Sequence, residues 1–462
     1  MFLRALSALL FMSNAFSNAF PFDSIWSLRN SIVYGDHVPP NPPHGHWVDT
    51  WTAMPQLTEP GNLPPPPYNG TTTIFFNSTI RQTIRTTTQA TTFRIRLSNA
   101  FGLTPLPITA MTVALPLALD RSQNLTGSPH INTTSLIPLT FSHSSNITLP
   151  PGSLAVSDPI TFPHSLPANS ILSLTLYLAS GQSGSAITSH PGSRTESFLS
   201  LGDLTRSANL TSPSAVSLFH WYFLSAVEAW SPHSTSALAI LGDSITDGRG
   251  SFLNANNRWP DLLSSRLQAP SSKHKNIAIL NQAAGGNRLL ADGLGPSGLE
   301  RVERDVLSHS GVKYALIFLG VNDIGTAPST TAAQTAVGDA IIHGYQQVIT
   351  RIHAHGVPVF GGTITPFGCA NQTLQPYSTG EREVTRVRVN NWIRDSVGKV
   401  GGFDGLVDFD EIVRDGRNQS RLLGRYDSGD CLHLNPDGYA AMARGFPLGL
   451  FEQFKGGVDG FV

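Results

Sequence analysis

The chain has 462 residues and a formal net charge of −1, and 13% of its residues are charged. This length can hold two or three domains, each with its own hydrophobic core. Because no run of lysine or arginine forms a basic segment, the composition argues against a nucleic acid or a membrane surface as a partner.

The first residues have the composition of a secretory signal peptide. Arg4 precedes an apolar run over 5–12, and small residues follow up to Ala15 and Ala19. This order predicts a signal peptide over 1–19 with cleavage after Ala19, although a buried N-terminal helix would show a similar apolar run. No later apolar stretch approaches the ~18 residues of a membrane span, so we expect a secreted, extracellular, soluble protein.

Sequons and cysteines favour the same compartment. The two cysteines, Cys369 and Cys431, predict a disulfide in an oxidising environment, and no CxxC spacing indicates a zinc site. Asn-x-Ser/Thr triplets without a middle proline predict a glycoprotein, decorated mostly before residue 210. The acceptor asparagines are Asn69, Asn77, Asn124, Asn132, Asn146, Asn209, Asn371 and Asn418.

An extended, Pro/His-rich lead-in over 20–46 precedes a β-rich region over 47–234. Short runs of β-branched residues alternate there with turn residues, and no convincing helical pattern lies between them. This texture predicts an all-β sandwich with a jelly-roll-like arrangement. The predicted strands include 72–76, 79–84, 92–97, 171–178 and 216–219.

Strand and helix patterns alternate over 235–462. In the longest helical pattern, apolar residues such as Ile341, Tyr345, Val348 and Ile352 recur at spacings of three and four, as a helix packed on a sheet requires. The alternation predicts an α/β domain with a doubly wound parallel sheet. The predicted strands are 237–241, 277–280, 314–319, 357–361 and 406–409, and the predicted helices are 259–267, 299–307, 331–355 and 381–397.

Four short polar segments follow one another along this α/β region. Three of them each follow a predicted strand directly: Gly-Asp-Ser at 242–244, Asn-Gln-Ala-Ala-Gly-Gly-Asn at 281–287 and Gly-Val-Asn-Asp at 320–323. Asp-Cys-Leu-His follows at 430–433. Parallel strands present their carboxyl ends at one edge of a sheet, where open α/β folds bind ligands. We therefore expect Ser244 at that edge, although a serine there could equally cap the next helix.

The residues of these segments suit nucleophilic catalysis. A serine hydroxyl needs a base to take its proton, and the imidazole of His433 can serve because it titrates near neutrality. Asp430 lies three residues earlier, within reach of the same ring from one helical turn, and would fix its tautomer. Asn435 and the proline after it predict a helix N-terminus that holds this loop rigidly. Taken alone, His433 could instead be a core histidine.

This ordered set of Ser, Gly, Asn and Asp-x-x-His resembles the SGNH (GDSL-like) hydrolase superfamily over about residues 236–455. The resemblance implies a flavodoxin-like hydrolase fold and an oxyanion hole made by the backbone N–H groups of Ser244 and Gly286 and the side-chain amide of Asn322. Gly285 is the alternative to Gly286. We expect hydrolysis of a carboxylic ester by Ser244, without a metal or an organic cofactor, and a disulfide that ties Cys431 near the site to Cys369.

The β-rich region carries a second resemblance. Trp-Val-Asp-Thr-Trp-Thr-Ala-Met-Pro at 47–55 and Arg-Leu-Ser-Asn-Ala-Phe-Gly at 96–102 are similar to the N-terminal part of secreted fungal GDSL-like lipases/acylhydrolases. A β-sandwich before such a hydrolase domain also resembles some carbohydrate acetylesterases. We therefore expect short acyl esters on carbohydrate as substrates. A lipase or lysophospholipase is the alternative, as is a glycan-binding protein with a non-catalytic hydrolase scaffold, for which Trp221 and Tyr222 could form a sugar platform or equally belong to the core.

Overall fold

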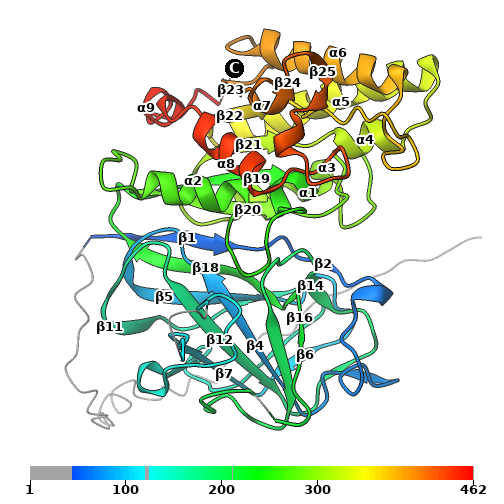
Figure 1. Ribbon diagram of the computed structural model, residues 1–462. Helices are drawn as coiled ribbons and strands as arrows, with labels where there is room; N and C mark the ends of the chain where they lie inside the picture. The colour runs from blue at the N-terminus through cyan, green and yellow to red at the C-terminus, as the bar shows by residue number, and fades with distance from the viewer. Residues whose placement is uncertain (1–43, 120–123, 211, 461–462) are drawn as a thin grey trace, which may run out of the picture. The chain divides into compact units, whose positions relative to one another are not determined.

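The computed structural model describes residues 44–119, 124–210 and 212–460 and is drawn in Figure 1. The predicted signal peptide over 1–19 and most of the predicted lead-in over 20–46 lie outside these ranges. Within the described ranges, no helix combines the length and the apolar character needed to cross a membrane.

Antiparallel sheets account for the described residues up to Ser231. Apolar side chains from the two larger sheets enter one core, including Ile95 from the first and Ile80 and Leu174 from the second, because alternate residues of a strand face the same side. The first sheet has the order β1(His46–Thr52), β18(Leu224–Ser231), β5(Ala90–Ser98), β10(Leu154–Val156), with β11(Ile160–Leu166) also paired to β5. The second has the order β16(Val216–Leu218), β15(Ser197–Leu201), β4(Ser78–Arg85), β12(Ile171–Leu178), β7(Ala110–Ala114), β8(Ile137–Pro138).

Smaller elements complete this region, and they include one prediction that was wrong in length. The strand expected over 72–76 is only β3(Thr73–Ile74), because Phe75 takes up a left-handed backbone conformation with a φ of 60°. The other four predicted strands are confirmed to within two residues. The jelly-roll topology and the boundary at 234 stay predictions. The remaining short elements are β2(Gln56–Leu57), β6(Leu106–Ile108), β9(Ile147–Leu149), β13(Gln182–Ser183), β14(Thr188–His190), β17(Trp221–Tyr222), η1(Pro60–Asn62) and η2(Thr133–Ser135).

A five-stranded parallel sheet lies at the centre of the described residues after Thr235. Numbered from the first of its strands, its order is 2-1-3-4-5, which is the flavodoxin-like order of doubly wound sheets. The predicted parallel sheet is therefore confirmed. In the order of the sheet, the strands are β20(Ile277–Ala283), β19(Ser236–Gly242), β21(Val312–Phe318), β22(Val359–Gly362) and β23(Gly405–Val407).

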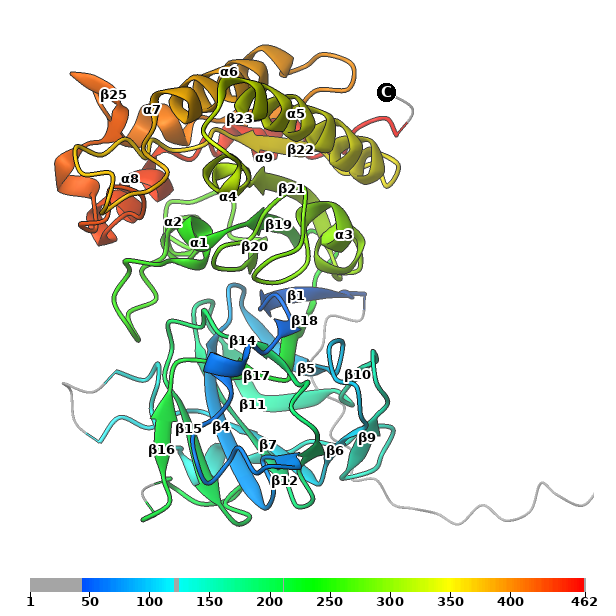
Figure 2. The same cartoon turned by 90° about the vertical axis from the view of Figure 1, so that its right-hand side faces the viewer.

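Helices lie on both sides of this sheet, with α2 and α8 on one side and α3 on the other (Figure 2). The helix predicted over 299–307 is instead α3 continued by one π-helical segment, η3(Glu303–Leu307). The α-helices are α1(Ser244–Asp247), α2(Trp259–Leu267), α3(Gly298–Val302), α4(Val321–Thr326), α5(Thr331–His353), α6(Gly380–Ser396), α7(Phe409–Val413), α8(Pro436–Gly445) and α9(Gly449–Gln453). A small hairpin, β24(Arg414–Asp415) and β25(Asn418–Leu422), and the 3-10 turn η4(Gly424–Tyr426) precede α8.

The register of the parallel sheet brings three strand ends to one level. Gly242, the last residue of β19, pairs with Ala283 of β20 and with Phe318 of β21. The segments that follow these three residues therefore leave the sheet side by side. They are three of the four polar segments singled out in the sequence.

Strand β1 of the antiparallel region lies against the parallel sheet, next to β20 in both views (Figures 1 and 2). Val48 packs on Ala237, Ala278 and Leu280, where small alanine side chains let the strand approach closely. The backbone N–H of Asp49 donates to the carbonyl oxygen of Ser310 at 2.9 Å. The β-rich region thus supplies part of the cover of the parallel sheet.

Candidate active site

Ser244 is the first residue of α1, a single helical turn that begins two residues after the end of strand β19. The helix is capped by Asp243, whose side chain accepts from the backbone N–H of Ile245 at 3.0 Å, so the serine hydroxyl is not used as a cap. At Gly242, a Cβ atom would lie 2.6 Å from Cβ of Thr246, which makes glycine necessary for this sharp strand-to-helix turn. The hydroxyl of Ser244 is left free for another partner.

That partner is His433. Oγ of Ser244 lies 2.7 Å from Nε2 of His433, and Nδ1 of the same ring lies 2.6 Å from Oδ2 of Asp430. A carboxylate only accepts, so the ring carries its hydrogen on Nδ1 and presents a lone pair to the serine hydroxyl. Both Ser244 and His433 are 6% exposed. The structure thus brings together three side chains separated by up to 189 positions in sequence.

Asp430 and His433 lie on an irregular loop, and the helical turn predicted there is wrong. Gly429 and Cys431 have φ values of 107° and 60°, which no right-handed helix accommodates. Oδ1 of Asp430 accepts instead from the backbone N–H groups of Leu432 and His433, at 3.0 and 2.8 Å. Burial alone would raise the pKa of Asp430, but its hydrogen bond and charge interaction with His433, together with these two N–H groups, lower that pKa.

Two further features hold the loop in place. Cys431 forms a disulfide with Cys369, 62 positions earlier, as expected. Asn435 caps α8 by accepting from the backbone N–H groups of Asp437 and Gly438, and a proline follows at the first helical position, which confirms the predicted helix start. The loop is therefore fixed on both sides of His433.

Three hydrogen-bond donors without a full set of partners line the same cavity as Ser244 and His433. The backbone N–H groups of Ser244 and Gly286 donate to no acceptor among the described residues. The side-chain amide of Asn322 donates one hydrogen to the carbonyl oxygen of Asn287 at 2.9 Å and keeps the other. Its oxygen accepts from the hydroxyl of Tyr377 at 3.3 Å, which fixes the direction of the amide.

The two glycines of the second segment differ in what they require. Gly286 has a φ of 71°, and a Cβ atom there would lie 2.7 Å from Cδ1 of Leu294. Gly285 has an ordinary φ, and a Cβ atom there would meet nothing within 4 Å. The backbone therefore demands glycine at 286 and merely tolerates it at 285, which favours Gly286 as the donor.

Two buried side chains that sequence reasoning missed hold these segments together. The guanidinium of Arg301 donates to the carbonyl oxygens of Gly242 and Gln282, at 3.1 and 2.6 Å, and to the side chain of Asn287. Asp323 accepts from backbone N–H groups at Leu289 and Leu290. Arg301 is 1% exposed, and an arginine inside a predicted amphipathic helix carries no local sign of this role.

The carboxyl group of Asp243, next to Ser244, is also buried. Burial raises its pKa to about 7, and the nearby Asp323 carboxylate acts in the same direction. The hydrogen bond from Ile245 and the charge of Arg301 oppose that rise. Asp243 is therefore a group whose charge state changes near neutrality inside the fold.

The antiparallel region contributes to the cavity as well. Gly192 and Arg194 line it, together with Asp247 and Arg249 from the α/β region, and the cavity has a volume of about 570 Å³. His190 lies behind it, with Nε2 at 2.9 Å from Oδ1 of Asp247. No sequence pattern pointed to these contributions from the antiparallel region, since they lie in a part of the chain predicted only as strands and turns.

Candidate metal ligands do not gather here. Within the described residues, no three His, Cys, Asp or Glu side chains come together as a metal ion would require. The chemistry open to this arrangement is that of a hydroxyl, an imidazole, a carboxylate and hydrogen-bond donors.

Comparisons with known proteins identify the region that carries this site. Residues 240–441 match the sequence model of the GDSL-like Lipase/Acylhydrolase family, and no curated protein sequence matches the chain. A carbohydrate acetylesterase from Sinorhizobium meliloti aligns at 13% identity and a TM-score of 0.35, over 48% of this chain and 99% of its own. An aryl esterase from M. smegmatis aligns at 14% identity and a TM-score of 0.35, over 48% and 100%. A GDSL-like lipase from Bacteroides thetaiotaomicron aligns at 13% identity and a TM-score of 0.31, over 45% and 84%.

The family match includes all four polar segments that were singled out in the sequence. It spans Ser244, Gly286, Asn322 and the loop that holds Asp430 and His433. Within that span, the strand order of the sheet is the flavodoxin-like order that the resemblance implied. Residues 240–441, which carry the site, are therefore similar to the GDSL-like Lipase/Acylhydrolase family, and the protein is an ester hydrolase.

Proposed function

We propose that the protein hydrolyses carboxylic esters through an acyl intermediate on Ser244. His433 takes the serine proton as general base, and Asp430 holds the imidazole with its hydrogen on Nδ1 and stabilises the imidazolium that forms. The observation that carries this proposal is the unbroken run of hydrogen bonds from Ser244 through His433 to Asp430, with contacts of 2.7 and 2.6 Å.

The free donors supply the second part of the mechanism. Attack by Oγ on the ester carbonyl carbon places a negative charge on the carbonyl oxygen, and the N–H groups of Ser244 and Gly286 and the amide of Asn322 stabilise it. Collapse breaks the bond to the alcohol, which leaves with the proton held by His433. Water, activated by the same imidazole, then attacks the acyl-serine, releases the carboxylic acid and returns the proton to Ser244.

The cavity supports a short acyl group on a polar alcohol, such as acetyl esters on carbohydrate. Of the described side chains that line it, only Leu294 and Leu432 are aliphatic, whereas Arg194, Arg249 and Asp247 are charged. Each methylene of an acyl chain gains about 0.8 kcal/mol only when it is buried against apolar surface. With only two aliphatic side chains beside three charged ones in the lining, a long acyl chain finds few partners there, and a lipase or lysophospholipase is the less favoured candidate.

The glycan-binding alternative loses its structural support. Trp221 and Tyr222, the aromatic pair that could have formed a sugar platform, are 2% and 0% exposed and belong to the β-rich core. Export remains part of the proposal: the signal-like start, the similarity of 47–55 and 96–102 to secreted fungal lipases/acylhydrolases and the sequons support a secreted glycoprotein. None of the eight sequon asparagines is buried.

A series of p-nitrophenyl esters from acetate to palmitate, run beside acetylated xylan, tests the function and the substrate class together. We expect the highest kcat/KM for the shortest acyl groups and release of acetate from the polysaccharide. The Ser244→Ala variant should be inactive on every substrate. Activity that rises with acyl length would favour the lipase, and full activity of Ser244→Ala would overturn the assignment of the nucleophile.

A further inference from the structure

A second cavity lies at the opposite edge of the parallel sheet from Ser244. It has a volume of about 620 Å³, and its lining includes Ser236, Ile277 and Val312, the first residues of β19, β20 and β21. Each of these strands has seven residues. At about 3.3 Å per residue, the cavity is therefore about 20 Å from the strand ends that carry the candidate active site.

This cavity gathers most of the lysines in the protein. The chain has only five lysines, and three of them, Lys273, Lys313 and Lys455, line it. These three come from the turn before β20, from β21 and from the segment after α9, so the fold brings them together from distant parts of the sequence. Sixteen residues line the cavity, so five lysines scattered over 462 residues would rarely place three of them there.

The positive charge in the cavity is not balanced. The only carboxylate in the lining is Glu452, whose Oε1 is 3.8 Å from Nδ1 of His274. None of the three lysines forms an ion pair within the described residues. With neutral imidazoles the lining carries three positive charges and one negative charge, a balance of +2, in a chain whose formal net charge is −1. All three lysines are exposed, so their ammonium groups are free to reach an anion that enters the cavity.

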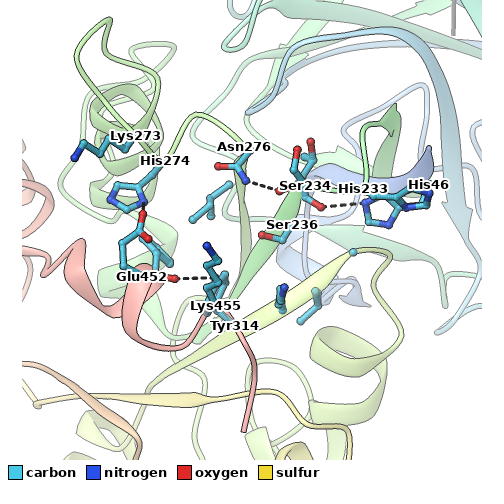
Figure 3. A pocket seen from close by; sticks show the side chains of 16 residues that line it. His46, His233, Ser234, Ser236, Lys273, His274, Asn276, Tyr314, Glu452 and Lys455 are labelled. Atoms are coloured by element: carbon cyan, nitrogen blue, oxygen red, sulfur yellow. Dashed lines mark hydrogen bonds and ion pairs between the residues drawn. The ribbon is translucent and has the colours of Figure 1, made fainter. Parts of the chain in front are cut away.

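Neutral donors and imidazoles complete the lining. Figure 3 shows Lys273 and His274 across the cavity from His46 and His233. The hydroxyl groups of Ser234 and Ser236 make no hydrogen bond to any described residue. The floor is closed by the buried ring of Tyr314, whose hydroxyl already donates to the carbonyl oxygen of Phe451 at 3.0 Å. The cavity therefore offers ammonium groups, imidazoles and hydroxyls at its lining.

We propose that this cavity binds a multivalent oxyanion, a small polar molecule that carries two or more phosphate, sulfate or carboxylate groups. Three ammonium groups on separate segments suit a ligand with several anionic groups better than a ligand with a single anionic group. A volume of about 620 Å³ holds a small molecule rather than a folded partner. The same chemistry is offered by an oligophosphate and by a short acidic oligosaccharide, and the experiment separates these two sources.

Isothermal titration of the full chain at low ionic strength, with tripolyphosphate and with trigalacturonate as the two probes, tests the proposal. We expect saturable 1:1 binding of at least one probe, which weakens as salt is added because exposed charges are screened. The variant with Lys273→Gln, Lys313→Gln and Lys455→Gln should bind that probe at least about tenfold more weakly. The matched control is the variant with Lys275→Gln and Lys399→Gln, the two lysines outside the cavity, which should bind within about twofold of the native protein.

Hydrogen exchange of the native protein gives a second readout that does not depend on the variants folding. The bound probe should slow exchange in the segments around 273–277, 311–314 and 451–455. Binding of tripolyphosphate alone identifies a phosphate ligand, and binding of trigalacturonate alone identifies an acidic sugar; both results support the site. The proposal is overturned if neither probe binds saturably, or if the control variant loses as much affinity as the cavity variant. Because binding rather than turnover is measured, neither result depends on the esterase assignment.

Discussion

Replacing Gly286 with alanine tests whether the backbone at this position supplies an oxyanion donor. The φ of 71° at Gly286 is a left-handed conformation, which costs a residue with a Cβ roughly 1–2 kcal/mol. The new methyl group would also meet Cδ1 of Leu294 at 2.7 Å. Leu294 is 50% exposed, so its side chain can move aside, and the backbone strain is the larger effect.

That strain leaves the variant two ways to respond, and each predicts a measurable loss. If the backbone keeps its conformation, the free energy of unfolding falls by about 1–2 kcal/mol and kcat is largely kept. If the backbone relaxes, the N–H of residue 286 turns away from the cavity, and the loss of one oxyanion donor lowers kcat by roughly 10²–10³-fold. We expect the backbone to relax. Gly286 itself is partly exposed at the surface, whereas Arg301 and Asp323 hold only the residues that follow it.

Urea unfolding and steady-state hydrolysis of p-nitrophenyl acetate separate these responses, and Gly285→Ala is the matched control. A Cβ at residue 285 meets nothing within 4 Å, and its φ is ordinary. Gly285→Ala should therefore keep the free energy of unfolding and lower kcat far less than Gly286→Ala. Native kcat and native stability in Gly286→Ala, or a larger loss of kcat in Gly285→Ala, would refute the assignment of the donor.

Three other substitutions test the charged groups around the site. Asp430→Asn should lower kcat by roughly 10³–10⁴-fold in the p-nitrophenyl acetate assay, because the amide no longer favours the productive tautomer of His433; unchanged activity would contradict its role. Folding raises the pKa of Asp243 from 3.8 to about 7. The carboxyl group therefore ionises first in the unfolded chain, and the free energy of unfolding falls as pH rises between these two values. The side chain of Asp243→Asn cannot ionise, so the free energy of unfolding of this variant, measured with urea, should rise relative to that of the native protein by up to about 4 kcal/mol between about pH 4 and pH 8. A difference that does not vary with pH would contradict the raised pKa of Asp243. His190→Ala should destabilise the fold by about 1–3 kcal/mol by leaving the buried side chain of Asp247 without its hydrogen-bond partner, and a second change, Asp247→Asn, should restore part of the loss in a double-mutant cycle; additive losses would show that the pair is not coupled.

Much of the site could be predicted because its residues follow strand ends directly. Apolar runs identified β19, β20 and β21, and parallel strands that pair in register end together, so Ser244, Gly286 and Asn322 had to emerge at one edge. The helix start at Asn435 was likewise indicated by a local signal, a capping residue followed by proline. Local patterns sufficed wherever the position of a residue depended on its own strand or helix.

Local patterns failed where geometry depended on positive φ angles or on distant partners. The turn that carries Asp430 is not helical, because Cys431 takes a left-handed conformation that nothing in its neighbours requires and that goes together with its disulfide. The role of Arg301 depends on carbonyl groups that only the folded sheet brings near it. The lysine cavity is similar, since the scarcity of lysine is visible in the sequence but the meeting of Lys273, Lys313 and Lys455 is not.

The contact between His190 and Asp247 bears on why the β-rich region is present at all. The ring of His190 lies between two acceptors, with Nδ1 at 3.0 Å from the carbonyl oxygen of Met54 and Nε2 at 2.9 Å from Oδ1 of Asp247. The ring therefore bridges the segment that holds Met54 and the helical turn that holds Asp247. Asp247 ends the helical turn that Ser244 begins. The β-rich region therefore supplies a hydrogen-bond partner for a buried carboxyl group one helical turn from Ser244, and the α/β region without it would leave that oxygen of Asp247 without this partner.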